Sequence, residues 1–179
     1  MDSPVNNTLT EPPSEYTYRA MKVSENLVVG LATGGYIGRA PFGPGTLGSL
    51  PGILFYYFMS EKPLLPAFLV LVAWILFAVW VAGRAEKLLG AEDPGCIVID
   101  EIAGMAVTFA AIPFHFSLMI IGFIVFRFFD ILKPFPINLV DKHVKGGLGV
   151  VSDDVLAGIF SNIVLQILIK VFYAAPVAG

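Results

Sequence analysis

The chain has 179 residues, of which 56% are hydrophobic and 14% are charged, and its formal net charge is −3. This length suits a single domain, and the charged fraction lies well below the roughly one quarter that is typical of soluble proteins. The acidic net charge excludes a basic nucleic-acid-binding protein, and the single cysteine excludes a disulfide framework or a thiolate metal cluster. These values leave a small membrane protein or a soluble protein with an unusually apolar interior, and we favour the membrane protein. Because the apolar runs are long and lack strict period-two alternation, we predict an all-α fold, a compact helical membrane protein.

The N-terminal segment differs in composition from the rest of the chain. Residues 1–24 are polar and contain three prolines, with no apolar stretch of the kind found in a signal peptide. We predict that residues 1–24 form a disordered cytosolic tail and that residues 25–175 form one helical domain. A short apolar segment at 26–31 and a Gly- and Pro-rich stretch at 34–52 lead into a predicted helix at 50–59.

The clearest membrane-spanning segment covers residues 63–83. It has no charge between Lys62 and Arg84, and about 20 apolar residues are enough for a helix to cross a bilayer core about 30 Å thick. A charged loop at 84–93 follows this segment.

Three further apolar runs occupy the second half of the chain. The runs at 102–114 and 116–129 would each be about 20 Å long as helices. We expect either half-spanning segments or longer helices whose charged ends dip into the membrane. A polar loop at 130–154 precedes the last predicted span, at 155–173.

The basic residues predict the orientation of these helices. If successive helices alternate in direction, most basic residues share one side, namely Arg19, Lys22, Arg39, Arg84, Lys87, Lys133, Lys142 and Lys145. Lys62 lies on the opposite side. The positive-inside rule makes the crowded side cytosolic, and the polar loops of interest lie on this side.

Five carboxylates lie at the ends of apolar segments on the same side. A carboxylate at such a position requires a counter-charge, and only Arg127 and Lys133 are close basic neighbours in the sequence. A hard divalent cation such as Mg²⁺, which prefers oxygen ligands, would balance the charge. His115 and His143 have no partner at ligand spacing. The predicted ligands are Asp100, Glu101, Asp130, Asp153 and Asp154.

A purely structural interpretation of these carboxylates stays open. The pairs at 100–101 and 153–154 are predicted at helix starts, where acidic side chains accept hydrogen bonds from free N–H groups and complement the helix dipole. Asp130 is predicted to end an apolar run, three residues after Arg127, so the two can form an ion pair.

The segment at 43–48 formally matches G-x-G-x-x-G. No strand precedes it, which excludes a dinucleotide-binding fold. A glycine-rich turn that enters a helix can still bind an anion through its N–H groups, and Thr46 and Ser49 add hydroxyl groups. The alternative is a plain turn at the start of a helix.

Four motifs together resemble the phosphatidylglycerophosphatase A family, over roughly residues 34–166. The motifs are P-G-T-L-G-S-L at 44–50, D-P-G-C-I-V-I-D-E at 93–101, F-R-F-F-D-I-L-K-P-F-P-I at 126–137, and G-G-L-G at 146–149 followed by D-D-V-L-A-G at 153–158.

The resemblance implies Mg²⁺-dependent hydrolysis of phosphatidylglycerophosphate, a phospholipid in the bilayer, to phosphatidylglycerol and phosphate. The family's acidic positions fall on the five predicted ligands, which would also be the catalytic residues. As a separate hypothesis about the mechanism, we expect Asp130 or Asp154 to be the general base. Asp93 and Asp141 are weaker candidates. Residues expected to bind the substrate phosphate are Thr46, Ser49, Arg127 and Lys133.

The family also contains soluble members, so the membrane prediction rests on residues 63–83 and not on the resemblance. We expect the bacterial inner (cytoplasmic) membrane, with the site facing the cytosol and no nucleic-acid partner. Three alternatives stay open: a small membrane transporter, a scaffold with clustered charges, and a phosphatase of a different lipid phosphate.

Overall fold

The structure, a computed structural model, describes residues 22–173, and within this range the chain forms helices and no strand. The all-α prediction is confirmed. The predicted tail falls largely on residues 1–21, which lie outside the described range. The elements are α2 (Val23–Ala32), the 3₁₀ turn η1 (Ile37–Arg39), α3 (Pro44–Met59), α4 (Leu64–Leu89), α5 (Ile99–Thr108), α6 (Phe116–Leu132), α7 (Ile137–His143), α8 (Gly146–Leu168) and the π-helical turn η2 (Ile169–Tyr173).

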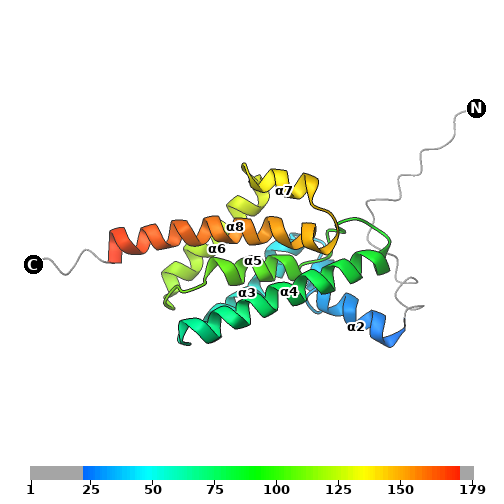
Figure 1. The fold of residues 1–179 in the computed structure, drawn as a ribbon, viewed down its shortest axis with the longest axis horizontal. Helices are drawn as coiled ribbons and strands as arrows, with labels where there is room; N and C mark the ends of the chain where they lie inside the picture. Colours follow the sequence, from blue (N-terminus) through cyan, green and yellow to red (C-terminus); the bar gives the residue numbers. More distant parts are fainter. Residues whose placement is uncertain (1–21, 174–179) are drawn as a thin grey trace, which may run out of the picture.

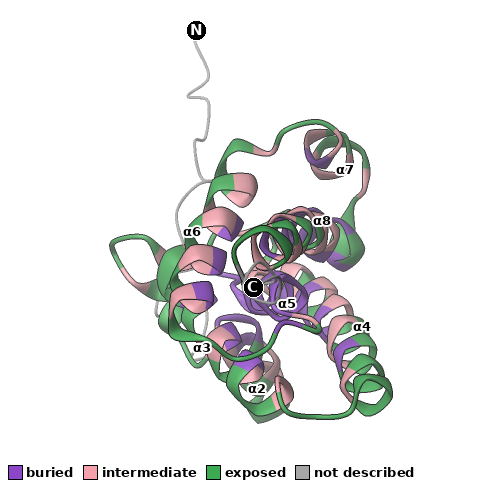
Figure 2. Cartoon of the chain, turned by 90° about the vertical axis from the view of Figure 1, so that its left-hand side faces the viewer, coloured by how far each residue is buried: buried purple, intermediate pink, exposed green. Residues whose placement is uncertain are grey.

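The short helix α5 forms the centre of the molecule. It contacts α3, α4, α6 and α8, which surround it (Figure 2). Its ten residues are buried except Glu101, which is partly buried. Small and aliphatic side chains such as Ala103 and Met105 let the surrounding helices pack closely against α5.

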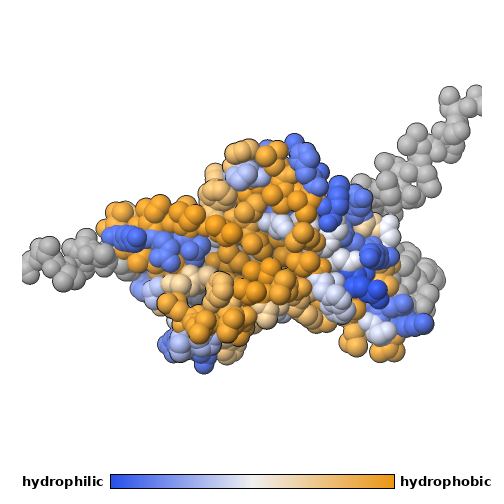
Figure 3. Space-filling model, in the orientation of Figure 1, coloured by the Kyte–Doolittle hydropathy of each residue, from blue (hydrophilic) through white to orange (hydrophobic). Residues whose placement is uncertain are grey.

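The helices alternate in direction (Figure 1). Helices α3, α5 and α8 begin at the end of the molecule where α4 and α6 finish. As a result, three helix N-termini lie together at one end, together with the charged residues that precede or follow the helices. Figure 3 shows hydrophilic residues gathered at this end, on the right, and an apolar band over the middle.

Within residues 22–173, two helices are long and apolar enough to cross a membrane, Leu64–Leu89 and Gly146–Phe172. The first exposes large apolar side chains along its length, among them Phe68, Leu76 and Trp80. Exposed apolar surface of this extent is expected where lipid, not water, is the solvent. We conclude that the chain is membrane-associated.

Several predicted helix boundaries are wrong, and the errors at the starts of α3 and α8 have the same physical cause. Helix α3 begins at Pro44 instead of residue 50, and α8 begins at Gly146 instead of residue 155. In both segments glycine permits close helix packing: a Cβ on Gly48 would overlap Val98, and one on Gly147 would overlap the backbone of α4. A further error is at the end of α4, which continues through the predicted charged loop to Leu89.

Helix α5 is shorter than the predicted 102–114 segment, since it ends at Thr108. The Asn162 side chain of α8 donates hydrogen bonds to the carbonyls of Thr108 and Ala110, at 2.9 and 2.8 Å. Backbone carbonyls at the end of a buried helix require such donors, because no water is available at this depth. Asn162 therefore allows α5 to end inside the bundle.

Candidate active site

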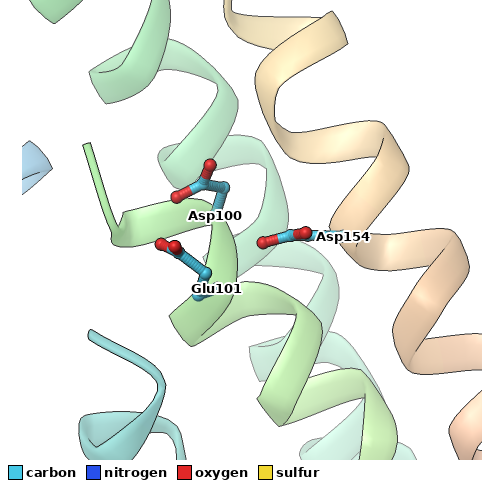
Figure 4. A group of neighbouring side chains, drawn as sticks. All are labelled: Asp100, Glu101 and Asp154. Carbon is cyan, nitrogen blue, oxygen red and sulfur yellow. The ribbon is translucent and has the colours of Figure 1, made fainter. Parts of the chain in front are cut away.

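Three carboxylates meet at the polar end of the bundle. Asp100 and Glu101 occupy the first turn of α5, and Asp154 points from α8 towards this turn (Figure 4). One oxygen from each lies within 4.8 Å of the others. Asp100 is 8% exposed and Asp154 is 3% exposed. The sequence motifs at 93–101 and 153–158 therefore converge on one buried cluster, which we call the acidic cluster.

Asp153 and Asp154 do not lie at a helix start, so the purely structural interpretation as helix caps does not apply to them. Because α8 begins at Gly146, these residues lie about two turns inside the helix. Asp100 and Glu101 do lie in the first turn of α5, where the helix dipole favours negative charge.

Burial and mutual repulsion disfavour full ionisation of the acidic cluster. The pKa of Asp100 is well above its ordinary value because the group is buried and because Glu101 is close. Burial also raises the pKa of Glu101, to about 8; the charges of Asp154 and Asp130 add to the effect, while the hydrogen bond with Asp100 and the charge of Arg127 oppose it. A cation in the cluster would reverse this preference.

The cluster also contains unused hydrogen-bond acceptors. Among the described residues, no hydrogen-bond donor reaches the buried atoms Asp100 Oδ1, Glu101 Oε2 or Asp154 Oδ2. Buried polar atoms in native proteins nearly always have partners. Three carboxylates from two helices, each with an unpartnered oxygen, fit the all-oxygen donor set of a hard divalent cation. The cluster can therefore hold a metal ion.

The other two predicted ligands, Asp130 and Asp153, form ion pairs with basic side chains. Asp130 forms an ion pair with Arg127 one turn earlier on α6, and Asp153 accepts from Lys133 Nζ at 2.5 Å. Arg127 also lies near the acidic cluster, since its charge lowers the pKa of Glu101. Within residues 22–173, the structure thus separates the five predicted carboxylates into two that form ion pairs and three that form none.

Lys133 connects three helices. It ends α6 with a left-handed backbone, φ +41°, a conformation that is uncommon for a residue other than glycine and concentrates at functional sites. Its ammonium bonds Asp141 of α7 as well as Asp153, each at 2.5 Å. Burial alone would lower the pKa of Lys133, but the two carboxylates outweigh this effect and raise it.

The weaker candidates Asp93 and Asp141 border a small cavity of about 50 Å³ together with Asp153 and Glu86. The Asp93 N–H donates to the Glu86 carboxylate at 2.9 Å. Glu86 is not among the residues predicted to form the site, because residues 84–93 are predicted as a loop. Because α4 continues to Leu89, Glu86 lies in the last turn of this helix and not in a loop.

The glycine-rich segment reaches the acidic cluster at Gly45. A Cβ on Gly45 would overlap Glu101 and lie 3.2–3.3 Å from the guanidinium nitrogens of Arg127. Thr46 is exposed in the first turn of α3. Ser49 is buried, and its hydroxyl donates to the Gly45 carbonyl at 2.7 Å, within its own helix. Gly45 is therefore the residue of this segment that touches the cluster.

Comparison with known proteins matches residues 30–169 to the family model described as phosphatidylglycerophosphatase A. The chain belongs to the phosphatidylglycerophosphatase A family. The matched range contains the acidic cluster, both cationic side chains and Gly45.

Curated relatives support the same family. The chain is 39% identical to phosphatidylglycerophosphatase A of Escherichia coli over 73% of this chain and 77% of that protein, and 38% identical to the Haemophilus influenzae protein of the same name over 68% and 76%. It is also 37% identical to a Bacteroides thetaiotaomicron protein provisionally named phosphatidylinositol-3-phosphatase, over 82% and 96%. No solved structure matches the chain significantly.

Proposed function

We propose that this protein hydrolyses the phosphate monoester of phosphatidylglycerophosphate, in a Mg²⁺-dependent reaction that yields phosphatidylglycerol and inorganic phosphate. The observation that carries the proposal is the acidic cluster, which has unpartnered buried oxygens and lies near Arg127, in a member of the phosphatidylglycerophosphatase A family. We choose phosphatidylglycerophosphate as the substrate because two relatives are named phosphatidylglycerophosphatase A.

In this proposal Asp100, Glu101 and Asp154 hold Mg²⁺. The ion would neutralise charge on the phosphate oxygens and lower the pKa of a bound water molecule. Side chains close to the cluster would bind the phosphate and accept the proton of the attacking water.

Arg127 binds the phosphate, because a guanidinium can contact two phosphate oxygens at once. Asp130 holds Arg127 through their ion pair. Asp130 is also a neighbour of Glu101 and Asp154, and in this proposal it acts as the general base that accepts a proton from the attacking water. Lys133 is the second phosphate-binding cation, and its contacts with Asp141 and Asp153 fix it at the edge of the site.

The first turn of α3 completes the anion-binding surface. Gly45 and Thr46 present N–H groups that have no acceptor within the helix. The absence of a side chain at Gly45 lets Glu101 and Arg127 lie directly against the backbone of this turn. The hydroxyl of Thr46 is exposed on the same turn, whereas Ser49 supports the turn through its bond to Gly45.

The protein acts in this proposal at the cytosolic face of the bacterial inner membrane. The end with the acidic cluster carries Arg84, Lys87, Lys133, Lys142 and Lys145, whereas Lys62 and Lys170 lie at the other end. This asymmetry satisfies the positive-inside rule. The gathering of charges at one end also argues against a transporter, whose charged residues would line a route between two faces.

Phosphate release by the purified full-length protein tests the activity. Phosphatidylglycerophosphate in detergent micelles should release phosphate in the presence of Mg²⁺ and not in EDTA, and added Mg²⁺ should restore the reaction. Asp154→Asn should be inactive. Glu92→Gln, which changes a carboxylate that is 82% exposed and pairs with Lys145, serves as the matched control. Activity that persists in EDTA would contradict the metal-dependent reaction.

Phosphatidylinositol 3-phosphate is a second candidate substrate. The relative that carries this name aligns over more of its own length than the two others, 96%. The same assay with this lipid separates the candidates, because the preferred substrate will have the higher kcat/KM.

A further inference from the structure

A large apolar pocket lies at the end of the molecule remote from the acidic cluster. It has a volume of about 600 Å³ and is formed by the second half of α3, the first turns of α4 and the end of α5. Its walls include Phe55, Met59, Leu65, Phe68, Leu71 and Ala110. Phe55 lies ten residues after Gly45 on α3, which corresponds to about 15 Å along the helix. The pocket is therefore separate from the candidate active site.

The pocket opens on the surface that faces lipid. Leu64, Leu65 and Phe68 line it and are 70%, 69% and 60% exposed. They form the first turns of the candidate span Leu64–Leu89, whose other end lies beside the acidic cluster. Because the bilayer core is about 30 Å thick, the pocket lies in the leaflet opposite to the cluster, and its opening continues the lipid-facing surface of α4.

The charge at the mouth of the pocket is positive. Of the described residues that line it, only Lys62 is charged. Lys62 forms no salt bridge within residues 22–173. It directly precedes the α4 span, at the depth where lysine side chains reach the membrane interface and the lipid phosphates. The Ser60 hydroxyl lies at the same mouth.

We propose that this pocket binds one acyl chain of an anionic phospholipid of the leaflet opposite to the acidic cluster, with the lipid phosphate on Lys62. The apolar walls suit the acyl chain of such a lipid, and the cationic residue at the mouth suits its phosphate. The volume lies within the range of pockets that enclose small-molecule ligands. This binding site rests on the membrane placement of the chain and not on the proposed phosphatase activity.

Photo-crosslinking tests the proposal on the full-length protein in nanodiscs. The probe is phosphatidylglycerol with a diazirine near the end of one acyl chain, and mass spectrometry locates the labelled peptides. We expect label on pocket residues of α3 and α4. Ala67→Trp fills the pocket and should remove this label, whereas Ala73→Trp, on the same helix but outside the pocket, should leave it. Size-exclusion chromatography establishes that both variants are folded, and Ala67→Phe replaces the tryptophan variant if that one aggregates.

A second variant tests the headgroup contact. Lys62→Gln should reduce the preference of the pocket for the phosphatidylglycerol probe over the matching phosphatidylcholine probe by about fivefold, which corresponds to about 1 kcal/mol for one basic residue near a membrane surface. An unchanged preference would overturn the assignment of the phosphate to Lys62.

Three results would overturn the acyl-chain site itself. Label that Ala67→Trp does not reduce would place the lipid elsewhere. Label that disappears in Asp154→Asn would show that the chain belongs to a lipid bound at the acidic cluster. A stable dimer that Ala67→Trp dissociates would assign the pocket to a second copy of the chain. None of these readouts depends on phosphatase activity.

Discussion

Gly45 of α3 lies directly against the Glu101 carboxylate of α5, at a separation that leaves no space for a side chain. Arg127 of α6 lies against the same glycine. Through this contact the glycine-rich segment, the acidic cluster and the phosphate-binding arginine form one site, although they are more than 25 residues apart in the sequence.

The first prediction concerns this contact. Gly45→Ala should displace Glu101 and Arg127 and reduce kcat by about 100-fold, since a displacement of about 1 Å in an active site has effects of this size. Gly95→Ala is the matched control, because a Cβ at Gly95 meets nothing within 4 Å. Phosphate release measures the effect, and equal rates for the two variants would contradict it.

The second prediction concerns metal binding. Asp154→Asn removes one of the three proposed ligands and should reduce activity by at least about 100-fold, the upper range for the loss of a residue that only supports a metal ligand. Mg²⁺ at 100 times its Kd should stabilise the wild-type protein by about 2.7 kcal/mol. Thermal unfolding in detergent should show this rise in Tm for the wild type and not for the variant. An equal rise in both proteins would exclude Asp154 as a ligand.

The third prediction is a pH dependence of the metal-free protein. The pKa of Glu101 is about 8 in the folded state, compared with 4.5 for an ordinary glutamate. Between these values the folded protein keeps a proton that the unfolded chain has lost, so stability should decrease as the pH rises from about 4.5 to about 8. Glu101→Gln should reduce this slope, as measured by denaturant unfolding in EDTA.

The same titration predicts the pH dependence of metal binding. Metal ligands must be deprotonated, so the affinity for Mg²⁺ should increase with pH up to about 8. Calorimetric titration with Mg²⁺ measures this change. An affinity that stays constant between pH 6 and pH 8 would show that Glu101 is not a ligand.

The fourth prediction separates two roles of Lys133. Lys133→Met leaves Asp153 buried without a cation and should destabilise the protein by about 3 kcal/mol, as is typical when one partner of a buried pair is removed. Adding Asp153→Asn should restore much of the stability but not the activity, if Lys133 also binds phosphate. Full recovery of both would assign Lys133 a structural role only.

The fifth prediction concerns Arg127. Arg127→Lys keeps the charge but loses the two-point contact with phosphate, so kcat/KM should decrease by about 10-fold to 100-fold. The Tm should change little because a lysine can still pair with Asp130. Unchanged kinetics would argue against a phosphate contact by Arg127.

Much of the fold could be predicted from residue types alone. The uncharged run after Lys62 predicts α4, and the alternation of helix directions places all the acidic motifs at one end. The spacing of Arg127 and Asp130 predicts their ion pair, which the structure contains. These predictions succeed because they depend only on apolar runs and on which residues are neighbours on one helix, and both can be read from the sequence.

The errors at the starts of α3 and α8 arise because a glycine-rich segment can form either a turn or a close helix contact. A run such as G-G-L-G at 146–149 is typical of a loop, and yet here it begins α8, since Gly147 packs against the backbone of α4. The choice between a turn and a close helix contact depends on the neighbouring helix, which the sequence does not specify. For the same reason the sequence could not separate Asp154, in the acidic cluster, from Asp153, which pairs with Lys133.

The enclosed position of α5 has a mechanical consequence. When a bilayer becomes thinner or thicker, helices in contact with lipid respond by tilting, and α4 and α8 would respond in this way if they span the membrane. Helix α5 is buried on all sides and is held at its far end by Asn162. Asp100 and Glu101 are therefore insulated from such deformation, and their spacing should stay constant in membranes of different thickness.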